Sequence, residues 1–171
     1  MTGTKQGTDA SWSTKAMLPF SLKRELVFDN PQGHRPQVVI RRITGRLEKA
    51  KPLELKVHDE RLSFRGSRPL FVTGLNLLVS ITRGNVEARS EDGRLFVRYQ
   101  LCFHDLVFGS GFLSLIFGLL IYSFLEWSMT QGVLGAAFAF ASLWGFNTWG
   151  SAGAFRRMIR KCWKEIQADA S

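Results

Sequence analysis

The chain has 171 residues, with 23 Lys and Arg against 14 Asp and Glu, so its formal net charge is +9. The mean hydropathy of -0.03 averages a polar N-terminal part with a strongly apolar C-terminal part. The two cysteines, Cys102 and Cys162, form no CxxC pair and suit a reducing compartment as free thiols, which argues against a disulfide framework.

Residues 1–17 are rich in Thr, Ser and Gly, and we predict a disordered tail there. The segment has no apolar stretch of the kind that a secretory signal contains. We therefore expect the N-terminal part of the protein to stay in the cytoplasm.

Residues 18–105 are predicted to form a cytoplasmic β-domain. Apolar and polar residues alternate along 53–58, 75–82 and 95–104, a pattern typical of half-buried antiparallel strands. Residues 38–43 are β-branched and lie between Pro36 and Gly45, so we interpret them as a strand as well. Further short strands are expected at 26–28, 61–65 and 86–89.

Turn residues separate these runs. Asp59-Glu60, Gly84-Asn85 and Glu91-Asp92-Gly93 each fit a hairpin turn, because Gly, Asn and Asp accept positive φ. With six or seven strands and no helix, the predicted fold is an all-β antiparallel meander that closes into a small sandwich or barrel.

Residues 106–125 and 127–155 contain no charged side chain. About 20 apolar residues of helix cross a bilayer core of about 30 Å, and a chain of this size could not bury two such helices in a soluble core. We predict a membrane protein with a two-helix transmembrane hairpin at 106–155, with helices at 106–126 and 132–155. Asp105 is expected as the N-cap of the first helix, which would hold the β-domain against the bilayer.

The basic residues predict the orientation of the hairpin. The connection between the helices has no Lys or Arg and one acid, Glu126. Lys and Arg gather on the cytoplasmic side of membrane helices, and here they lie before the first helix, at Arg94 and Arg98, and after the second. The expected location is the inner (plasma) membrane, multi-pass, with both termini cytoplasmic.

Small residues mark the second helix. Gly135, Ala139, Ser142 and Gly145 could form one thin stripe that lets another helix approach, with Asn147 adding an interhelical hydrogen bond. The alternative is packing on the first helix, where Ser110, Ser114 and Gly118 are also small. Because small residues lie on more than one side, we expect a homo-oligomer or a larger membrane-protein complex.

The C-terminal tail, 156–171, is basic and amphipathic. Six apolar residues recur at helical spacing: Phe155, Met158, Ile159, Cys162, Trp163 and Ile166. The polar positions carry Arg156, Arg157, Arg160, Lys161 and Lys164. Two interpretations stay open: a helix lying in the membrane surface and contacting anionic lipids, or a cytoplasmic extension of the second helix packed on the β-domain.

No catalytic, nucleotide-binding or zinc-protease motif is present. His34, His58 and His104 are widely separated, and no spacing suggests metal ligands. We expect no cofactor, no metal and no nucleic acid partner. The sequence favours a non-enzymatic integral membrane protein whose β-domain is an interaction or scaffold subunit of a membrane assembly. The alternatives are a protein that binds anionic lipids and an accessory subunit of an oligomeric channel or transporter.

Overall fold

The computed structural model describes residues 20–66, 80–124 and 128–170. These residues form one five-stranded antiparallel sheet in the order β1-β5-β4-β3-β2, together with three helices. The predicted disordered tail, the first residues of the predicted 75–82 strand, and Glu126 lie outside the described residues. The elements in chain order are β1 (Ser21–Asp29), α1 (Pro36–Lys49), β2 (Glu54–His58), β3 (Arg61–Arg65), β4 (Arg83–Glu91), β5 (Arg94–Cys102), α2 (His104–Phe124) and α3 (Met129–Asp169).

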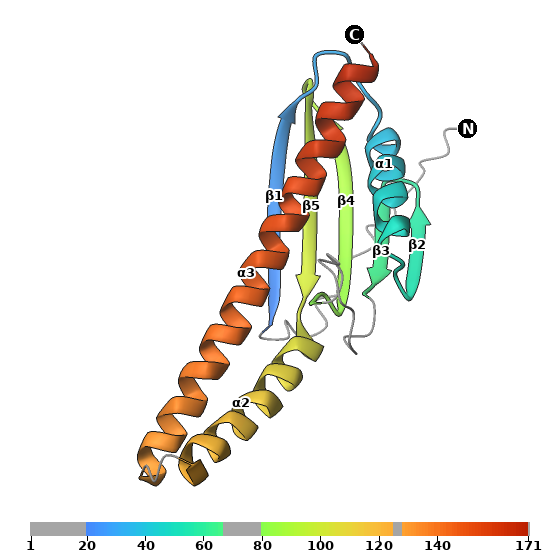
Figure 1. The fold of residues 1–171 in the computed structure, drawn as a ribbon. Coiled ribbons are helices and arrows are strands. Elements are labelled where there is room, and N and C mark those ends of the chain that lie inside the picture. Colours follow the sequence, from blue (N-terminus) through green and yellow to red (C-terminus); the bar gives the residue numbers. More distant parts are fainter. Residues whose placement is uncertain (1–19, 67–79, 125–127, 171) are drawn as a thin grey trace, which may run out of the picture.

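The helices divide the molecule into two parts (Figure 1). The helix α1 and the C-terminal half of α3 lie against the sheet, whereas α2 and the N-terminal half of α3 run side by side beyond its end. The strands lie nearly parallel to the C-terminal half of α3. One helix, α3, therefore belongs to both parts.

The period-two alternation correctly predicts strand β5 and its buried face. Leu95, Val97, Tyr99 and Leu101 are buried beneath the helices, and the residues between them lie on the opposite face. The turn before β5 is also as expected: Glu91 pairs with Arg94, and Asp92 and Gly93 both have positive φ, as a two-residue hairpin loop requires.

The face of the sheet turned away from the helices carries a row of alternating charges. Glu25, Arg98, Glu87 and Arg61 are cross-strand neighbours on β1, β5, β4 and β3. Arg98 donates to Glu25 at 2.8 Å, and Arg61 lies 3.1 Å from Glu87. Opposite charges directly across strands favour this register over a slipped one.

The interpretation of 38–43 as a strand is wrong, because these residues lie in α1. Pro36 begins the helix, and Val39, Ile40, Ile43 and Leu47 follow at the spacing of one helical face. All four are fully buried against the sheet. The β-branched composition suggested a strand, but burial of this face outweighs the small difference in intrinsic propensity.

Because residues 38–43 are helical, the architecture also differs from the predicted one. The described strands form a single open sheet of five strands instead of a sandwich or barrel of six or seven. Its apolar face is covered by α1 and α3, so burial of that face requires no second sheet.

Gly84-Asn85 is not a turn, because both residues lie inside β4. The Phe64 ring on β3 lies directly over Gly84, where a Cβ atom would come within 2.2 Å of the ring. An isolated glycine within a strand often marks such a close approach. The glycine is therefore required for packing and not for a change of chain direction.

The C-terminal tail extends the second apolar helix and packs on the β-domain, which is the second of the two interpretations above. Phe155 stacks on Phe64 with ring centroids 5.7 Å apart and contacts the Tyr99 ring at 5.4 Å. Trp163 contacts Phe28 at 5.5 Å, and Ile159 is fully buried. The tail is thus the C-terminal half of α3, and its apolar face completes the core of the β-domain.

Ion pairs between α1 and α3 were not predicted. Arg46 pairs with Glu165, and Arg42 pairs with Asp169 and lies 4.0 Å from Glu165. These side chains are partly exposed, so each pair contributes about 0–1 kcal/mol. They favour one alignment of the two helices but add little to the stability of the core.

Gly84→Ala is expected to destabilise the protein by about 1–3 kcal/mol, because the confined Phe64 ring must move away from the new methyl group. Thermal unfolding of the purified protein in mild detergent measures the change. Gly45→Ala in α1 is the matched control, since no heavy atom lies within 4 Å of its new Cβ, and alanine favours the helix by up to about 1 kcal/mol. Equal midpoints for the two variants would contradict this role of Gly84.

Candidate functional site

Two helices of the described structure are long and apolar enough to cross a membrane: α2 and the N-terminal part of α3. Only Phe103 separates β5 from α2, and its N–H donates to the carbonyl of Phe20. Asp105 lies in the first turn of α2 instead of at its N-cap, and its backbone N–H donates to the hydroxyl of Thr82. The apolar hairpin is therefore joined to the sheet without a flexible linker.

The surface of the hairpin is apolar on nearly every side. Large side chains of both helices are exposed, among them Phe108 at 75%, Phe138 at 77% and Phe146 at 82%. Soluble monomeric proteins rarely expose a continuous apolar surface of this extent, which is typical of a region covered by lipid or by another protein. This surface is the first component of the candidate site.

The two helices touch most closely at small residues. A Cβ atom on Gly118 of α2 would lie 2.7 Å from the Ala136 methyl and 3.1 Å from the Gly132 carbonyl of α3. Ser114 and Ser110, one and two turns earlier on α2, are also buried. The small residues on α2 thus serve packing within the hairpin.

The predicted stripe on α3 lies only partly in this contact. Gly135 approaches Ile121, and Ala139 and Ser142 line an apolar groove between α2 and α3. Gly145 has no heavy atom within 4 Å of a Cβ position. Asn147 is exposed and donates to the Leu143 carbonyl of its own helix at 2.7 Å. Gly145 and Asn147 therefore stay available to a second helix, and their role in an interface remains a prediction.

The short connection between the helices begins α3 with a capping box. The hydroxyl of Ser128 accepts from the N–H of Gln131, whose side chain accepts from the N–H of Ser128. This reciprocal pair satisfies N–H groups that the first turn of a helix leaves without partners. The chain reversal is thus stabilised locally, at the end of the hairpin farthest from the sheet.

The basic residues of α3 are all exposed and lie along the half of the helix that covers the sheet: Arg156, Arg157, Arg160, Lys161 and Lys164. Three arginines, Arg156, Arg24 and Arg160, act on the buried Tyr99 hydroxyl. Burial raises the pKa of Tyr99, and these guanidinium groups partly oppose that rise. A positive region therefore lies in the half of the sheet nearer the hairpin.

Cys102 and Cys162 are free thiols, as expected. Burial raises the pKa of both, so both favour the uncharged thiol. Within residues 20–66, 80–124 and 128–170, no three His, Cys, Asp or Glu side chains converge as metal ligands do. His34 packs on Trp163, His104 packs on Phe20, and His58 is the last residue of β2.

No family model matches this sequence, and comparisons with curated proteins and with solved structures give no significant match. The functional argument therefore depends on the residues and geometry of this chain.

Replacing Gly118 with Ile is expected to separate α2 from α3 and to lower hairpin stability by about 1–3 kcal/mol, because the backbones can approach only over a residue without a side chain. Gly145→Ile is the matched control for stability, since its side chain would enter open space. Thermal unfolding and light scattering in mild detergent measure stability and oligomeric state. A smaller oligomer for Gly145→Ile at unchanged stability would support the predicted interface between copies, and an unchanged oligomer would remove it.

Proposed function

We propose that this chain is a non-enzymatic integral membrane protein that presents a cytoplasmic β-domain, at one fixed orientation, as an interaction or scaffold subunit of a membrane assembly. The hairpin of α2 and α3 is the anchor. The plasma membrane is the proposed location, with both termini in the cytoplasm.

The continuity of α3 carries this proposal. Its N-terminal half exposes apolar side chains such as Phe138 and Phe146, whereas its C-terminal half buries Phe155 and Ile159 against the sheet. A helix is stiff over this length, so the domain cannot rotate freely about its anchor. A rigid mount of this kind suits a subunit that must meet its partner at a set height and orientation above the bilayer.

The charge distribution supports the proposed orientation. The described part of the hairpin between Leu106 and Phe155 carries no Lys, Arg, Asp or Glu, and basic residues adjoin the sheet end of both helices. Lys and Arg are favoured on the cytoplasmic side. The capped reversal at Ser128 would then lie outside the cell.

The proposed partner surface is the face of the sheet opposite α1 and α3. The helix-facing side is already covered, so the outer side is the broad β-surface left to a partner. It presents charged side chains, including Arg89 beside the Phe96 ring at 5.7 Å and the Glu25–Arg98 pair. Such a surface favours a partner with complementary charge.

The topology can be tested by cysteine labelling in intact cells. Ser128→Cys should react with a membrane-impermeant maleimide added outside, whereas Arg41→Cys on the exposed side of α1 should react only after permeabilisation. The unmodified chain is the background control, because Cys162 is buried and Cys102 half-buried. Labelling of Arg41→Cys in intact cells would overturn the proposed orientation.

The scaffold role predicts a stoichiometric partner that depends on the outer face of the sheet. Arg89→Glu should lower recovery of this partner at least fivefold after cross-linking in membranes and purification in mild detergent. Arg41→Glu makes the same charge change on α1 and should leave recovery unchanged. A chain that purifies as a clean monomer, or equal effects of the two substitutions, would count against the proposal.

A further inference from the structure

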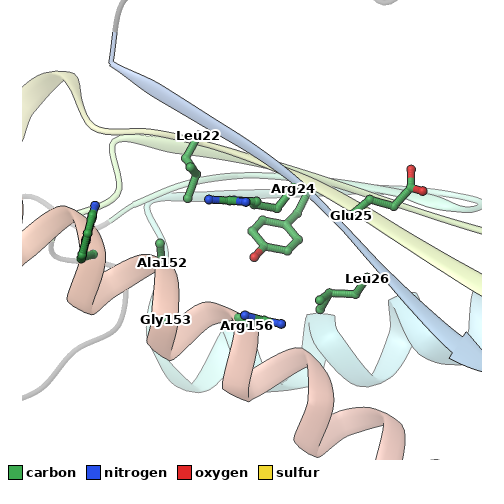
Figure 2. A pocket seen from close by; sticks show the side chains of 9 residues that line it. Leu22, Arg24, Glu25, Leu26, Ala152, Gly153 and Arg156 are labelled. Carbon is green, nitrogen blue, oxygen red and sulfur yellow. The ribbon is translucent and has the colours of Figure 1, made fainter.

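A cavity of about 420 Å³ lies between α3 and the edge strand β1. The β1 wall consists of Leu22, Arg24, Glu25 and Leu26, and the α3 wall includes Gly153 and Arg156 (Figure 2), together with Trp149. Ala152 and Gly153 have little or no side chain, which keeps α3 from filling the space. The volume falls within the range of small-ligand sites, about 300–1,000 Å³.

Two guanidinium groups enter this cavity from opposite walls. Figure 2 shows Arg24 along β1 and Arg156 on α3, with the carboxylate of Glu25 turned away from the helix. Glu25 is bound by Arg98 on the other side of the sheet at 2.8 Å. Among residues 20–66, 80–124 and 128–170, no carboxylate forms an ion pair with Arg24 or Arg156. Within the part of the chain that the structure describes, Arg24 and Arg156 thus have no ion-pair partner, and Glu25, which also lines the cavity, is paired with Arg98.

The floor of the cavity supplies a polar group. Tyr99 lines it from β5 and is only 2% exposed. Burial raises the Tyr99 pKa, although Arg156, Arg24 and Arg160 partly oppose the rise. Because the pKa is raised, the phenol stays protonated near neutral pH and can donate a hydrogen bond to an anion.

The mouth of the cavity, at Trp149, lies at the outer limit of the headgroup layer of the proposed anchor, and Arg156 lies seven residues further along α3, about 10 Å. The ring of Phe20 contacts both His104, at the start of α2, and Trp144 on α3, so these two positions lie at one level. Trp149 is five residues further along α3, about 8 Å at 1.5 Å per residue. The headgroup layer extends about 5–8 Å beyond the hydrocarbon core on each side.

One side chain on α3 also favours contact with this layer. Trp149 is 84% exposed at the mouth of the cavity, and Trp is enriched where the hydrocarbon meets the headgroups.

We propose that the cavity formed by Arg24, Arg156 and Tyr99 binds the phosphoryl group of an anionic membrane lipid. Guanidinium groups bind phosphate oxygens in a bidentate manner, and here each wall of the cavity supplies one. A choline headgroup would place its ammonium beside these cations, so the site discriminates against zwitterionic lipid. This inference rests on the proposed membrane anchor, which brings the cavity to the lipid surface.

The test uses the full-length protein in a non-ionic detergent, titrated at constant ionic strength with short-chain phosphatidylglycerol, short-chain phosphatidylcholine or inorganic phosphate. Native mass spectrometry and the shift of the thermal midpoint measure binding. The unmodified chain should bind phosphatidylglycerol at least tenfold more tightly than phosphatidylcholine. Arg24→Gln with Arg156→Gln should abolish this difference, and Tyr99→Phe should weaken phosphatidylglycerol binding about threefold to tenfold through loss of one hydrogen bond.

Arg157→Gln is the matched control, because Arg157 is exposed on the same turn of α3 but does not line the cavity. It should keep phosphatidylglycerol affinity within twofold of the unmodified chain. Equal affinity of the unmodified chain for the two lipids would overturn the site. If Arg156→Gln alone and Arg157→Gln lowered phosphatidylglycerol affinity equally, general charge attraction would explain the binding instead. Competition by inorganic phosphate would support phosphoryl recognition and show that a free anion can also occupy the site.

Failure of this inference is distinguishable from failure of the membrane anchor. Resistance of the protein to alkaline carbonate extraction from membranes tests the anchor alone. A protein that resists extraction but does not discriminate the two lipids keeps its anchor and loses this site. A protein that carbonate releases would instead overturn the proposed function.

Discussion

The contact between the apolar face of α3 and the sheet is the interaction on which the rest of the structure depends. Phe155 lies against Phe64 and Tyr99, and Trp163 lies against Phe28 and His34. Without this face, the inner side of β5 and much of α1 would lose their cover, because the described sheet is open and has no second sheet over it. Each large side chain buried here contributes about 1.5–3 kcal/mol relative to exposure. The stability of the β-domain is thus tied to a helix that begins in the apolar hairpin.

This dependence limits how the domain and hairpin can move relative to each other. The chain passes from β5 to α2 through Phe103, which is buried and hydrogen-bonded to Phe20. It passes from the hairpin back to the sheet within the unbroken helix α3. Two rigid connections at separate points oppose both rotation and tilting. Gly118 allows α2 and α3 to pack closely between those points. A partner or a lipid would therefore meet the outer sheet face and the cavity at the same relative positions in every copy.

Local patterns in the sequence predicted the strands, turns and helices that depend on residues close together in the chain. Strands β3 and β5, the Asp92-Gly93 turn and the two long apolar helices follow from alternation, turn chemistry and uncharged length. The pattern failed at α1, where β-branched residues also fit a buried helix, and at Gly84, whose role depends on a ring from another strand. The two interpretations of the C-terminal tail could not be separated, because an apolar helical face looks the same whether lipid or a sheet covers it. Arg24 and Arg156 are far apart in the chain, and no local signal predicts that they share a cavity.

The excess of positive charge has a different meaning once the charges are placed in the structure. Arg98, Arg42 and Arg46 have acidic partners that align strands or helices, so their charges are largely used within the fold. Arg24 and Arg156 face a shared space and have no such partner among the described residues. Both side chains are exposed, so water screens much of the repulsion between these two like charges. They lie in the half of the sheet nearer the apolar hairpin. A bound phosphoryl group would give both charges a partner there.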